Sequence, residues 1–403
     1  MTKYSKEYFT RERIKFGVKG AFNVDSVTDE YLENFRDCGF DLVQPVPANS
    51  HGEIRDRLLD FFDENGIEAY LDDRDVCLDM DIVSQYAHHP SYCGTYIKDE
   101  PGTDEMPEFA ERAKKYVEIN GRYPHVNLLP MYANAAQLKY GAGAAQIKHY
   151  DQDPQLYYKY CVAWASITPA DCMCMDVYPL RSNPAKPTYD KYIENICIFS
   201  KAAKEYNKKF YAYIQAFAWT TSVRNPDAQE FIWQMYSMLS FGCTGFFMWR
   251  YGGKGDPQEH DIIYPDGTLT DIYYAAKKAN TEVKRISDIY IRYNNIGAFN
   301  VNCTEQTPYL NMSYPITCDY ASFDTPHPLL VGCFEAKEGN GKALTIVNMT
   351  ELTEKKNISV SFSVTGYDKV TAYIKGEPCV LEKQNGKYEV SLEYGDGVFV
   401  TLD

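Results

Sequence analysis

The chain has 403 residues, a length that favours two domains, one of them large enough to be a closed barrel. Hydrophobic residues make up 45% and charged residues 24% of the chain, as in globular proteins that bury a core without disulfides or metals. The formal net charge is −15, and no basic stripe runs through the sequence. Nucleic acid is therefore a disfavoured partner.

No apolar run reaches the roughly 18 residues of a membrane span, and the charged segment 1–16 lacks the apolar core of a signal peptide. Twelve cysteines are scattered with no Cys-x-x-Cys pair and no zinc-finger spacing. Unpatterned thiols are typical of a reducing compartment. We therefore expect a cytoplasmic protein with no membrane partner, no metal and no other cofactor. A homo-oligomer is compatible with the sequence.

Short apolar segments alternate with amphipathic helical segments along the first part of the chain. The expected strands are 15–22, 41–46, 68–71, 93–97, 126–131, 172–177, 210–216 and 245–249. The helices expected after them are 28–38, 53–65, 80–86, 106–120, 156–167, 189–206, 228–241 and 271–286. Gly66 and Gly121 are expected to end two of these helices as C-caps.

Repeated βα units imply parallel strands joined by right-handed crossovers, and eight such units close a barrel. The predicted fold class is therefore α/β, a (β/α)₈ TIM barrel. A doubly wound open sheet is the alternative. Residues 19–24 (KGAFNV), which follow the start of the first strand, lack the Gly-x-Gly-x-x-Gly turn that binds phosphate in such sheets.

The pattern changes near residue 300. Strands are expected at 329–335, 343–349, 358–364, 369–374, 388–394 and 398–402, with glycine-rich turns at 339–341 and 395–397. This pattern predicts a small all-β sandwich after the barrel. The predicted domains are a catalytic barrel at 1–295 and a sandwich at 296–403. For the sandwich we favour packing on the barrel over weak sugar binding.

Reacting side chains in a (β/α)₈ barrel lie at the C-terminal ends of the strands. Polar and aromatic residues follow the expected strands here. The candidates for substrate binding are Asn23, Gln44, Lys98, Tyr132, Tyr178, Gln215, Trp219, Trp249 and Arg250. Tyr and Trp combine an apolar ring with a polar edge, which suits a sugar, although any one ring can equally be part of the core.

Cleavage of a glycosidic bond needs one carboxylic acid to protonate the leaving oxygen and a second carboxylate to attack, to activate water or to stabilise the transition state. Glu100 directly follows the fourth strand, and its neighbour Asp99 would help to keep it protonated. Asp176 ends the sixth strand and is the nearest second carboxylate. The alternatives are that Asp99 and Glu100 begin a helix and that Asp176 is a buried structural residue.

The segment 96–101 (YIKDEP) resembles a motif of the (β/α)₈-barrel glycoside hydrolases. In the retaining clan of that superfamily, strand 4 ends in Asn-Glu-Pro, and the Glu is the general acid/base. The resemblance covers the barrel and the appended sandwich without identifying a member family. It implies that Glu100 is the acid/base and that Asp99 replaces the Asn. The clan has its nucleophile, a Glu, at the end of strand 7, where this chain has Gln215, an amide that cannot serve.

Two mechanisms remain open. In one, Asp176 acts opposite Glu100 as nucleophile or as base, which we favour. In the other, the reaction is substrate-assisted. An adjacent Asp-Glu pair ending strand 4 is similar to that of the barrel-type β-hexosaminidases, where the Asp orients the 2-acetamido group of the substrate. Asp99 and Glu100 can both face the site only if the strand end is irregular, because neighbours on an ideal strand point to opposite faces.

The sequence therefore predicts a glycoside hydrolase or transglycosidase whose partner is a carbohydrate substrate. A non-catalytic carbohydrate-binding barrel is the alternative suggested by the missing strand-7 Glu. A metal-dependent barrel enzyme is the third hypothesis. Its candidate ligands are His88 and His89, or Asp72, Asp73 and Asp75, for which a loop or helix-end role is the preferred interpretation.

Overall fold

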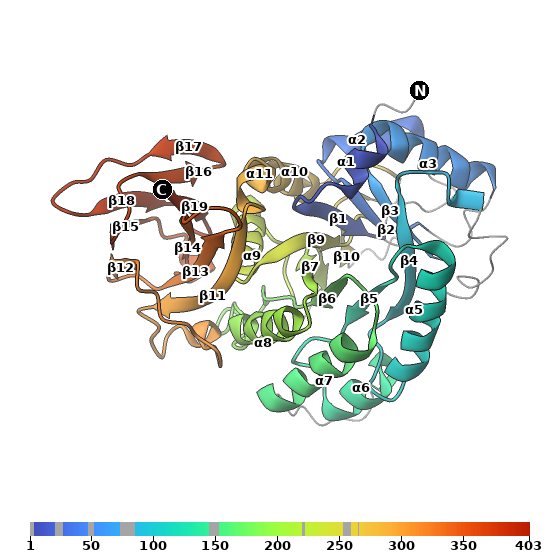
Figure 1. Cartoon of the computed structure of the whole chain (residues 1–403), viewed down its shortest axis with the longest axis horizontal. Helices are drawn as coiled ribbons and strands as arrows, with labels where there is room; N and C mark the ends of the chain where they lie inside the picture. The colour runs from blue at the N-terminus through green and yellow to red at the C-terminus, as the bar shows by residue number, and fades with distance from the viewer. Residues whose placement is uncertain are drawn as a thin grey trace.

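The computed structural model describes residues 4–20, 27–46, 52–72, 85–144, 153–219, 222–252, 259–264 and 266–403, with the side chains of 45–46, 219 and 259–260 outside that description. Figure 1 shows two parts side by side, a barrel that carries the N-terminus and a β-sandwich that carries the C-terminus.

Eight parallel strands form a closed barrel. In barrel order they are β1 (Lys15–Lys19), β2 (Leu42–Val46), β3 (Glu68–Leu71), β4 (Tyr92–Asp99), β5 (His125–Leu128), β6 (Cys172–Asp176), β7 (Lys209–Gln215) and β9 (Cys243–Trp249). The barrel closes where β1 pairs with β9, from Lys15 opposite Gly245 to Lys19 opposite Trp249. The predicted (β/α)₈ fold class is confirmed.

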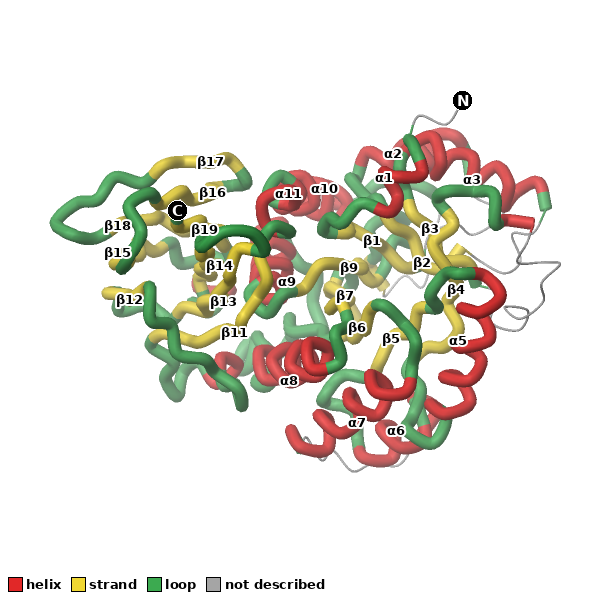
Figure 2. The backbone as a smooth tube through the Cα atoms, in the orientation of Figure 1, coloured by secondary structure: helices red, strands yellow, loops and turns green. Residues whose placement is uncertain are grey.

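Helices surround the strands (Figure 2). The main ones are α2 (Asp29–Asp37), α3 (Glu53–Asn65), α5 (Met106–Asn120), α7 (Pro154–Ile167), α8 (Tyr192–Glu205), α9 (Ala228–Leu239) and α10 (Asp271–Lys284). Shorter helices are α1 (Lys6–Thr10), α6 (Ala135–Tyr140) and α11 (Ser287–Tyr290). The predicted caps Gly66 and Gly121 end α3 and α5 in the left-handed conformation, with φ of 68° and 66°. The helix predicted at 80–86 lies mostly outside the described residues.

Two antiparallel sheets form the predicted β-sandwich. The larger has six strands in the order β11 (Tyr293–Val301), β13 (Leu329–Ala336), β14 (Lys342–Asn348), β19 (Gly397–Leu402), β16 (Val370–Ile374) and β17 (Glu377–Val380). The smaller has three, β12 (Ala321–Asp324), β15 (Ile358–Val364) and β18 (Tyr388–Leu392). Alternate residues such as Val331, Ile346 and Val360 are fully buried between the sheets. The sequence analysis missed β11, β12 and β17, because these strands have no run of buried apolar residues.

The other face of the six-stranded sheet packs on the barrel. Phe334 and Phe399 belong to the same buried cluster as the barrel helices, and both contact Tyr290 of α11, with ring centroids 5.4 and 5.5 Å away. Ser240, at the end of α9, hydrogen-bonds Thr345 of β14 at 2.7 Å. A continuous core therefore joins the sandwich to the barrel.

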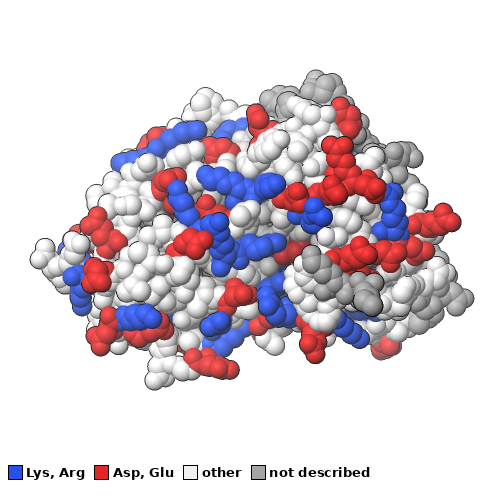
Figure 3. All heavy atoms as spheres, turned by 90° about the horizontal axis from the view of Figure 1, so that it is seen from above, with Lys and Arg blue, Asp and Glu red and all other residues white. Residues whose placement is uncertain are grey.

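The face of the molecule seen in Figure 3 carries basic and acidic side chains interspersed with one another. The net charge of −15 is therefore not gathered into one acidic patch on that face. None of the helices in the described ranges is both long and apolar enough to cross a membrane.

Gly332 tests how tightly the sandwich packs on the barrel. A Cβ atom there would lie 2.5 Å from both the carbonyl oxygen of Ser240 and Oγ1 of Thr345. We expect Gly332→Ala to lower the free energy of unfolding by about 1–3 kcal/mol, because the interface between the sandwich and the barrel has no room for an added methyl group. The measurement is the thermal midpoint by circular dichroism. Gly143→Ala is the control, since a Cβ there meets no atom within 4 Å. Equal thermal midpoints for the two variants would show that the interface between the sandwich and the barrel is not tightly packed at Gly332.

Candidate active site

The C-terminal ends of four barrel strands bring polar side chains together. Lys19 ends β1, Asp99 ends β4, Asn127 lies in β5 and Asp176 ends β6. Lys19 Nζ donates to Asp99 Oδ2 at 2.7 Å. Asn127 Nδ2 lies 3.4 Å from Asp99 Oδ1 and 3.3 Å from Asp176 Oδ1. The amide of Asn127 thus bridges the two aspartates, and the ammonium of Lys19 neutralises one of them.

Strand β4 ends irregularly. Its register against β5 shifts between Tyr96 and Lys98, and Glu100, the next residue after the strand, has φ of 48°. This left-handed backbone costs a non-glycine residue about 1–3 kcal/mol and is found preferentially at functional sites. Two hydrogen bonds hold it, from Glu100 N to the Asn127 carbonyl at 2.8 Å and from Ala142 N to the Glu100 carbonyl at 3.2 Å. The irregular strand end required for Asp99 and Glu100 to share one site is therefore present.

The segment after Glu100 packs closely against residues 139–141, which follow β5. A Cβ on Gly102 would lie 2.2 Å from the nitrogen of Gly141 and 2.4 Å from the Lys139 carbonyl oxygen, so only glycine fits this approach. The hydroxyl of Tyr160 donates to the Pro101 carbonyl at 2.8 Å. These contacts fix the backbone on which Glu100 stands.

Burial and mutual repulsion set the protonation of the three carboxyl groups. Burial raises the pKa of Glu100, and the charges of Asp176 and Asp99 raise it further. Burial and the charge of Asp99 also raise the pKa of Asp176. Burial opposes ionisation of Asp99 too, but Lys19 outweighs it and the pKa of Asp99 lies below its usual value. These shifts favour an ionised Asp99 and a proton held by the pair of Glu100 and Asp176 at neutral pH.

Three tyrosines lie next to the carboxyl groups. Burial raises the pKa values of Tyr132, Tyr178 and Tyr213 well above the ordinary value, and the nearby charges of Asp176 and Glu100 add to the rise in each case. These hydroxyls remain neutral and can donate hydrogen bonds. The site combines aromatic faces, hydroxyl groups and paired carboxyls.

Further charged and aromatic side chains lie beside these tyrosines. The ring of Trp249 lies 4.8 Å from Lys19 Nζ. The guanidinium of Arg181 lies 5.7 Å from the centroid of Tyr132 and 5.2 Å from that of Tyr189. Of the predicted substrate-binding residues, Tyr132, Tyr178 and Trp249 therefore lie in the neighbourhood of the carboxyl groups.

The structure places other predicted substrate-binding residues in supporting positions. Gln215 is fully buried; its Oε1 accepts from Leu180 N at 2.9 Å, and its Nε2 donates to the carbonyls of Leu180 at 3.2 Å and Arg224 at 2.6 Å. Gln44 is also fully buried, and its amide has no hydrogen-bond partner among the described residues. The Gln215 side chain therefore braces two loops instead of facing a ligand.

Two predicted basic residues are engaged elsewhere. Lys98 Nζ pairs with Glu105 Oε1 at 3.0 Å, beside helix α5. Arg250 Nε donates to both carboxylate oxygens of Asp261 at 3.1 Å. Asn23 and the side chain of Trp219 lie outside the described residues.

The sequence analysis missed Lys19, Asn127, Tyr213 and Arg181. Lys19 and Asn127 are polar residues inside otherwise apolar strands, and this contrast is the signal that could have found them. Tyr213 and Arg181 carry no comparable signal.

Within the described ranges, one group of three residues could hold a metal, Asp60, Asp63 and His89. His89 Nδ1 lies 2.8 Å from Asp63 Oδ2, and Asp63 Oδ1 accepts from Ser91 N at 2.9 Å. These bonds tie the end of α3 to the segment before β4, away from the carboxyl groups of the barrel mouth. Asp73 and Asp75 lie outside the described residues.

The chain is similar in structure to two proteins of known fold. A family 39 glycoside hydrolase from Bacteroides cellulosilyticus WH2 matches with a TM-score of 0.51 and 13% identity, over 99% of this chain and 82% of that one. A putative alpha-galactosidase/melibiase from Bacteroides fragilis NCTC 9343 matches with a TM-score of 0.52 and 12% identity, over 97% and 79%. No protein-family model and no curated protein sequence matches. The resemblance to the barrel glycoside hydrolases is confirmed at the level of the fold, with no member family identified.

The raised pKa of Glu100 predicts a pH-dependent cost in stability. A carboxyl that binds its proton more tightly in the folded protein makes folding less favourable as the pH rises above the ordinary Glu pKa of about 4.3. Glu100→Gln removes this cost because the amide stays neutral. We expect the variant to melt about 2–4 °C above the wild type at pH 8, with the difference shrinking towards pH 4.

Differential scanning calorimetry at a series of pH values measures this difference. Glu108→Gln, which removes an exposed carboxylate from α5, is the control for loss of one charge. A constant difference between Glu100→Gln and the wild type from pH 4 to pH 8 would show that Glu100 is not held protonated.

Proposed function

We propose that the protein is a glycoside hydrolase that cleaves a glycosidic bond in an oligosaccharide or another glycoside, with Glu100 as the general acid/base. The observation that carries this proposal is the group of three carboxyls at the barrel mouth. The raised pKa values of Glu100 and Asp176 leave a shared proton beside the ionised Asp99. The fold that the chain shares with glycoside hydrolases supports the same reading.

Glu100 suits the role of acid because its raised pKa favours retention of its proton at neutral pH. A general acid works best when its pKa lies near or above the working pH, so that it is protonated when the substrate binds. In the first step, Glu100 gives this proton to the glycosidic oxygen as the bond to the anomeric carbon breaks. Glu100 is then ionised and can take a proton from the incoming water.

Asp176 suits the second carboxylate. When the shared proton resides on Glu100, Asp176 is left ionised, and Asn127 donates to its Oδ1 at 3.3 Å. It can then attack the anomeric carbon or activate a water molecule. Gln215 at the end of β7 has neither a charge nor a free amide to offer.

Asp99 supports the substrate-assisted alternative. Its side chain is 43% exposed in the mouth although Lys19 binds one oxygen, so the carboxylate can reach a ligand. In this alternative, Asp99 orients a 2-acetamido group of the substrate, and that group attacks the anomeric carbon in place of Asp176.

Substrates with different leaving groups test the role of Glu100. In Glu100→Gln we expect kcat/KM to fall by about 10²–10⁴ on substrates with poor leaving groups, because their oxygen needs a proton. The fall should be much smaller on dinitrophenyl glycosides, whose leaving group departs without one. A panel of aryl glycosides and oligosaccharides measures this, with Glu108→Gln as the matched control. Unaltered turnover in Glu100→Gln would refute the assignment, and sugar binding without any turnover by the wild type would favour the non-catalytic barrel.

The second carboxylate is tested by comparing Asp176→Asn with Asp99→Asn. If Asp176 is the nucleophile or base, its variant should lose at least about 10² in kcat/KM on every substrate, whatever the leaving group. Substrate assistance predicts instead that Asp99→Asn loses activity chiefly on 2-acetamido sugars and that Asp176→Asn retains most of it. Initial rates on matched glucosides and 2-acetamido-glucosides separate the two.

A further inference from the structure

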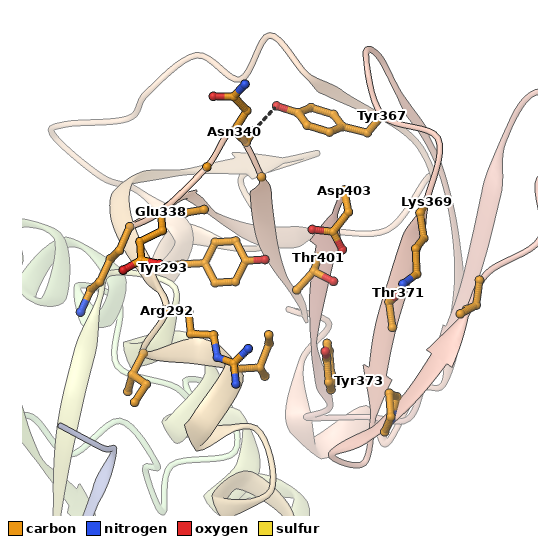
Figure 4. Close-up of a pocket in the computed structure, with 18 of the residues that line it drawn as sticks. Arg292, Tyr293, Glu338, Asn340, Tyr367, Lys369, Thr371, Tyr373, Thr401 and Asp403 are labelled. Carbon is orange, nitrogen blue, oxygen red and sulfur yellow. Dashed lines mark hydrogen bonds between the residues drawn. The ribbon is translucent and has the colours of Figure 1, made fainter. Parts of the chain in front are cut away.

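A large groove lies at the junction of the sandwich and the barrel, with a volume of about 1240 Å³ (Figure 4). Residues 289–293 form one wall, the turn at 336–341 forms a second, and strands β16, β17 and β19 form the floor and far side. The hydroxyl of Tyr367 donates to the carbonyl of Asn340 at 3.2 Å and so joins two loops at the rim. A contact between separate loops therefore helps to fix the shape of the groove at its rim.

The groove lies far from Glu100. Lys337 in its wall pairs with Glu12 at 2.8 Å, and Glu12 precedes the start of β1 at Lys15. Arg11 pairs with Asp288 of α11 at 3.2 Å. Both contacts are at the N-terminal end of β1, whereas Lys19, at its other end, lies beside the carboxyl groups. At about 3.3 Å per residue the strand separates the two sites by its whole length, so a ligand in the groove does not touch the catalytic carboxyls.

Fixed aromatic rings line the groove. Tyr293 and Tyr373 both contact the buried Phe399, with ring centroids 5.7 and 6.2 Å away. In Figure 4 the hydroxyl of Tyr293 points towards Thr401 and Asp403. The charges of Asp403 and Arg292 act on the pKa of Tyr293, which burial raises to about 12. Ring faces and polar groups therefore meet within one concave surface.

The lining favours a neutral ligand with many hydroxyl groups. Three basic side chains line the groove, Arg292, Lys337 and Lys369. Glu338 and Asp403 in the lining balance two of them, and Lys337 is paired with Glu12 just outside it, so the groove presents no net field for a phosphate or another anion. The exposed side chains of Arg292 and Asp403 and the hydroxyl of the half-buried Tyr293 offer both donors and acceptors, which a purely apolar ligand would leave unsatisfied. Typical small-molecule pockets enclose about 300–1,000 Å³, and this groove is larger, which leaves room for more than one sugar ring.

We propose that this groove is a second saccharide-binding site, which holds a neutral oligosaccharide or a stretch of neutral polysaccharide at the far end of the barrel from Glu100. Tyr373 and Tyr293 provide stacking surfaces, the exposed carboxylate of Asp403 accepts hydrogen bonds from the sugar hydroxyls, and the exposed guanidinium of Arg292 donates to them. The site does not depend on the catalytic assignment, because binding there involves none of the residues of the barrel mouth.

Affinity electrophoresis tests the site without turnover. Native gels contain a soluble α-glucan, β-glucan, xylan or galactomannan, and every protein carries Glu100→Gln so that the polymer stays intact. At least one polymer should retard the parent. Adding Tyr373→Ala should weaken the affinity about tenfold, the loss expected for removal of one stacking ring, and Tyr373→Phe should restore it. Tyr274→Ala, which removes a tyrosine 59% exposed on α10, is the matched control.

A second variant separates the groove from the barrel mouth. Trp249→Ala in the same background should leave most of the retardation in place, because Trp249 lies in the mouth. The proposal is overturned if no neutral polymer retards the parent, or if retardation falls with Trp249→Ala but not with Tyr373→Ala. An additional gel contains polygalacturonate, an anionic polymer. The proposal is also overturned if only this polymer retards the protein and salt abolishes the effect, since this would show an anion site. Thermal midpoints of all variants confirm that they are folded.

Discussion

The ammonium of Lys19 is the charge on which the mouth of the barrel depends. Three carboxyl groups meet there in surroundings that solvate charge poorly, and three carboxylates would repel one another strongly. Lys19 pairs with Asp99 and lies within 5.0 Å of the Tyr96 ring and 4.8 Å of the Trp249 ring, so it is fixed by aromatic faces as well as by its partner. One negative charge is thereby compensated, and a proton shared by Glu100 and Asp176 relieves the remaining repulsion. The surroundings of Glu100 and Asp176 therefore favour retention of a proton at the site.

The backbone supports this arrangement at a cost that the surrounding contacts offset. Glu100 occupies a left-handed conformation, and its peptide groups are bonded to Asn127 on one side and Ala142 on the other. Asn127 therefore has two roles, since its backbone positions Glu100 while its side chain bridges Asp99 and Asp176. Strand β5 thus couples the geometry of all three carboxyls.

The sequence was sufficient to predict the eight barrel strands, the sandwich and the positions of Asp99, Glu100 and Asp176 at strand ends, because periodicity and the rule for barrel sites depend on local pattern alone. Side-chain direction was not predictable. Lys98 turns towards Glu105 because the register of β4 shifts just before it, and no local pattern announces that shift. Gln215 binds the backbone of two loops that are distant in sequence, and Lys19 meets Asp99 only because the barrel brings β1 and β4 to a common mouth. Contacts across the barrel decide which strand-end residues face a ligand.

The groove in the sandwich follows from the same geometry. The six-stranded sheet is covered on one face by the three-stranded sheet and on the other by the barrel helices, where Phe334 and Phe399 are buried. Sheets twist, so the rounded flank of a barrel cannot follow such a sheet to its edge. Beyond Phe399 the floor is formed by β16 and β19, where the half-buried ring of Tyr373 lines the groove instead of packing under a helix. If the outer strands of this sheet had only a structural role, their side chains would be either apolar and buried or polar and fully exposed to solvent. The half-buried rings of Tyr293 and Tyr373, next to the exposed side chains of Arg292 and Asp403, are neither, and this combination of ring faces and polar groups suits a sugar ring.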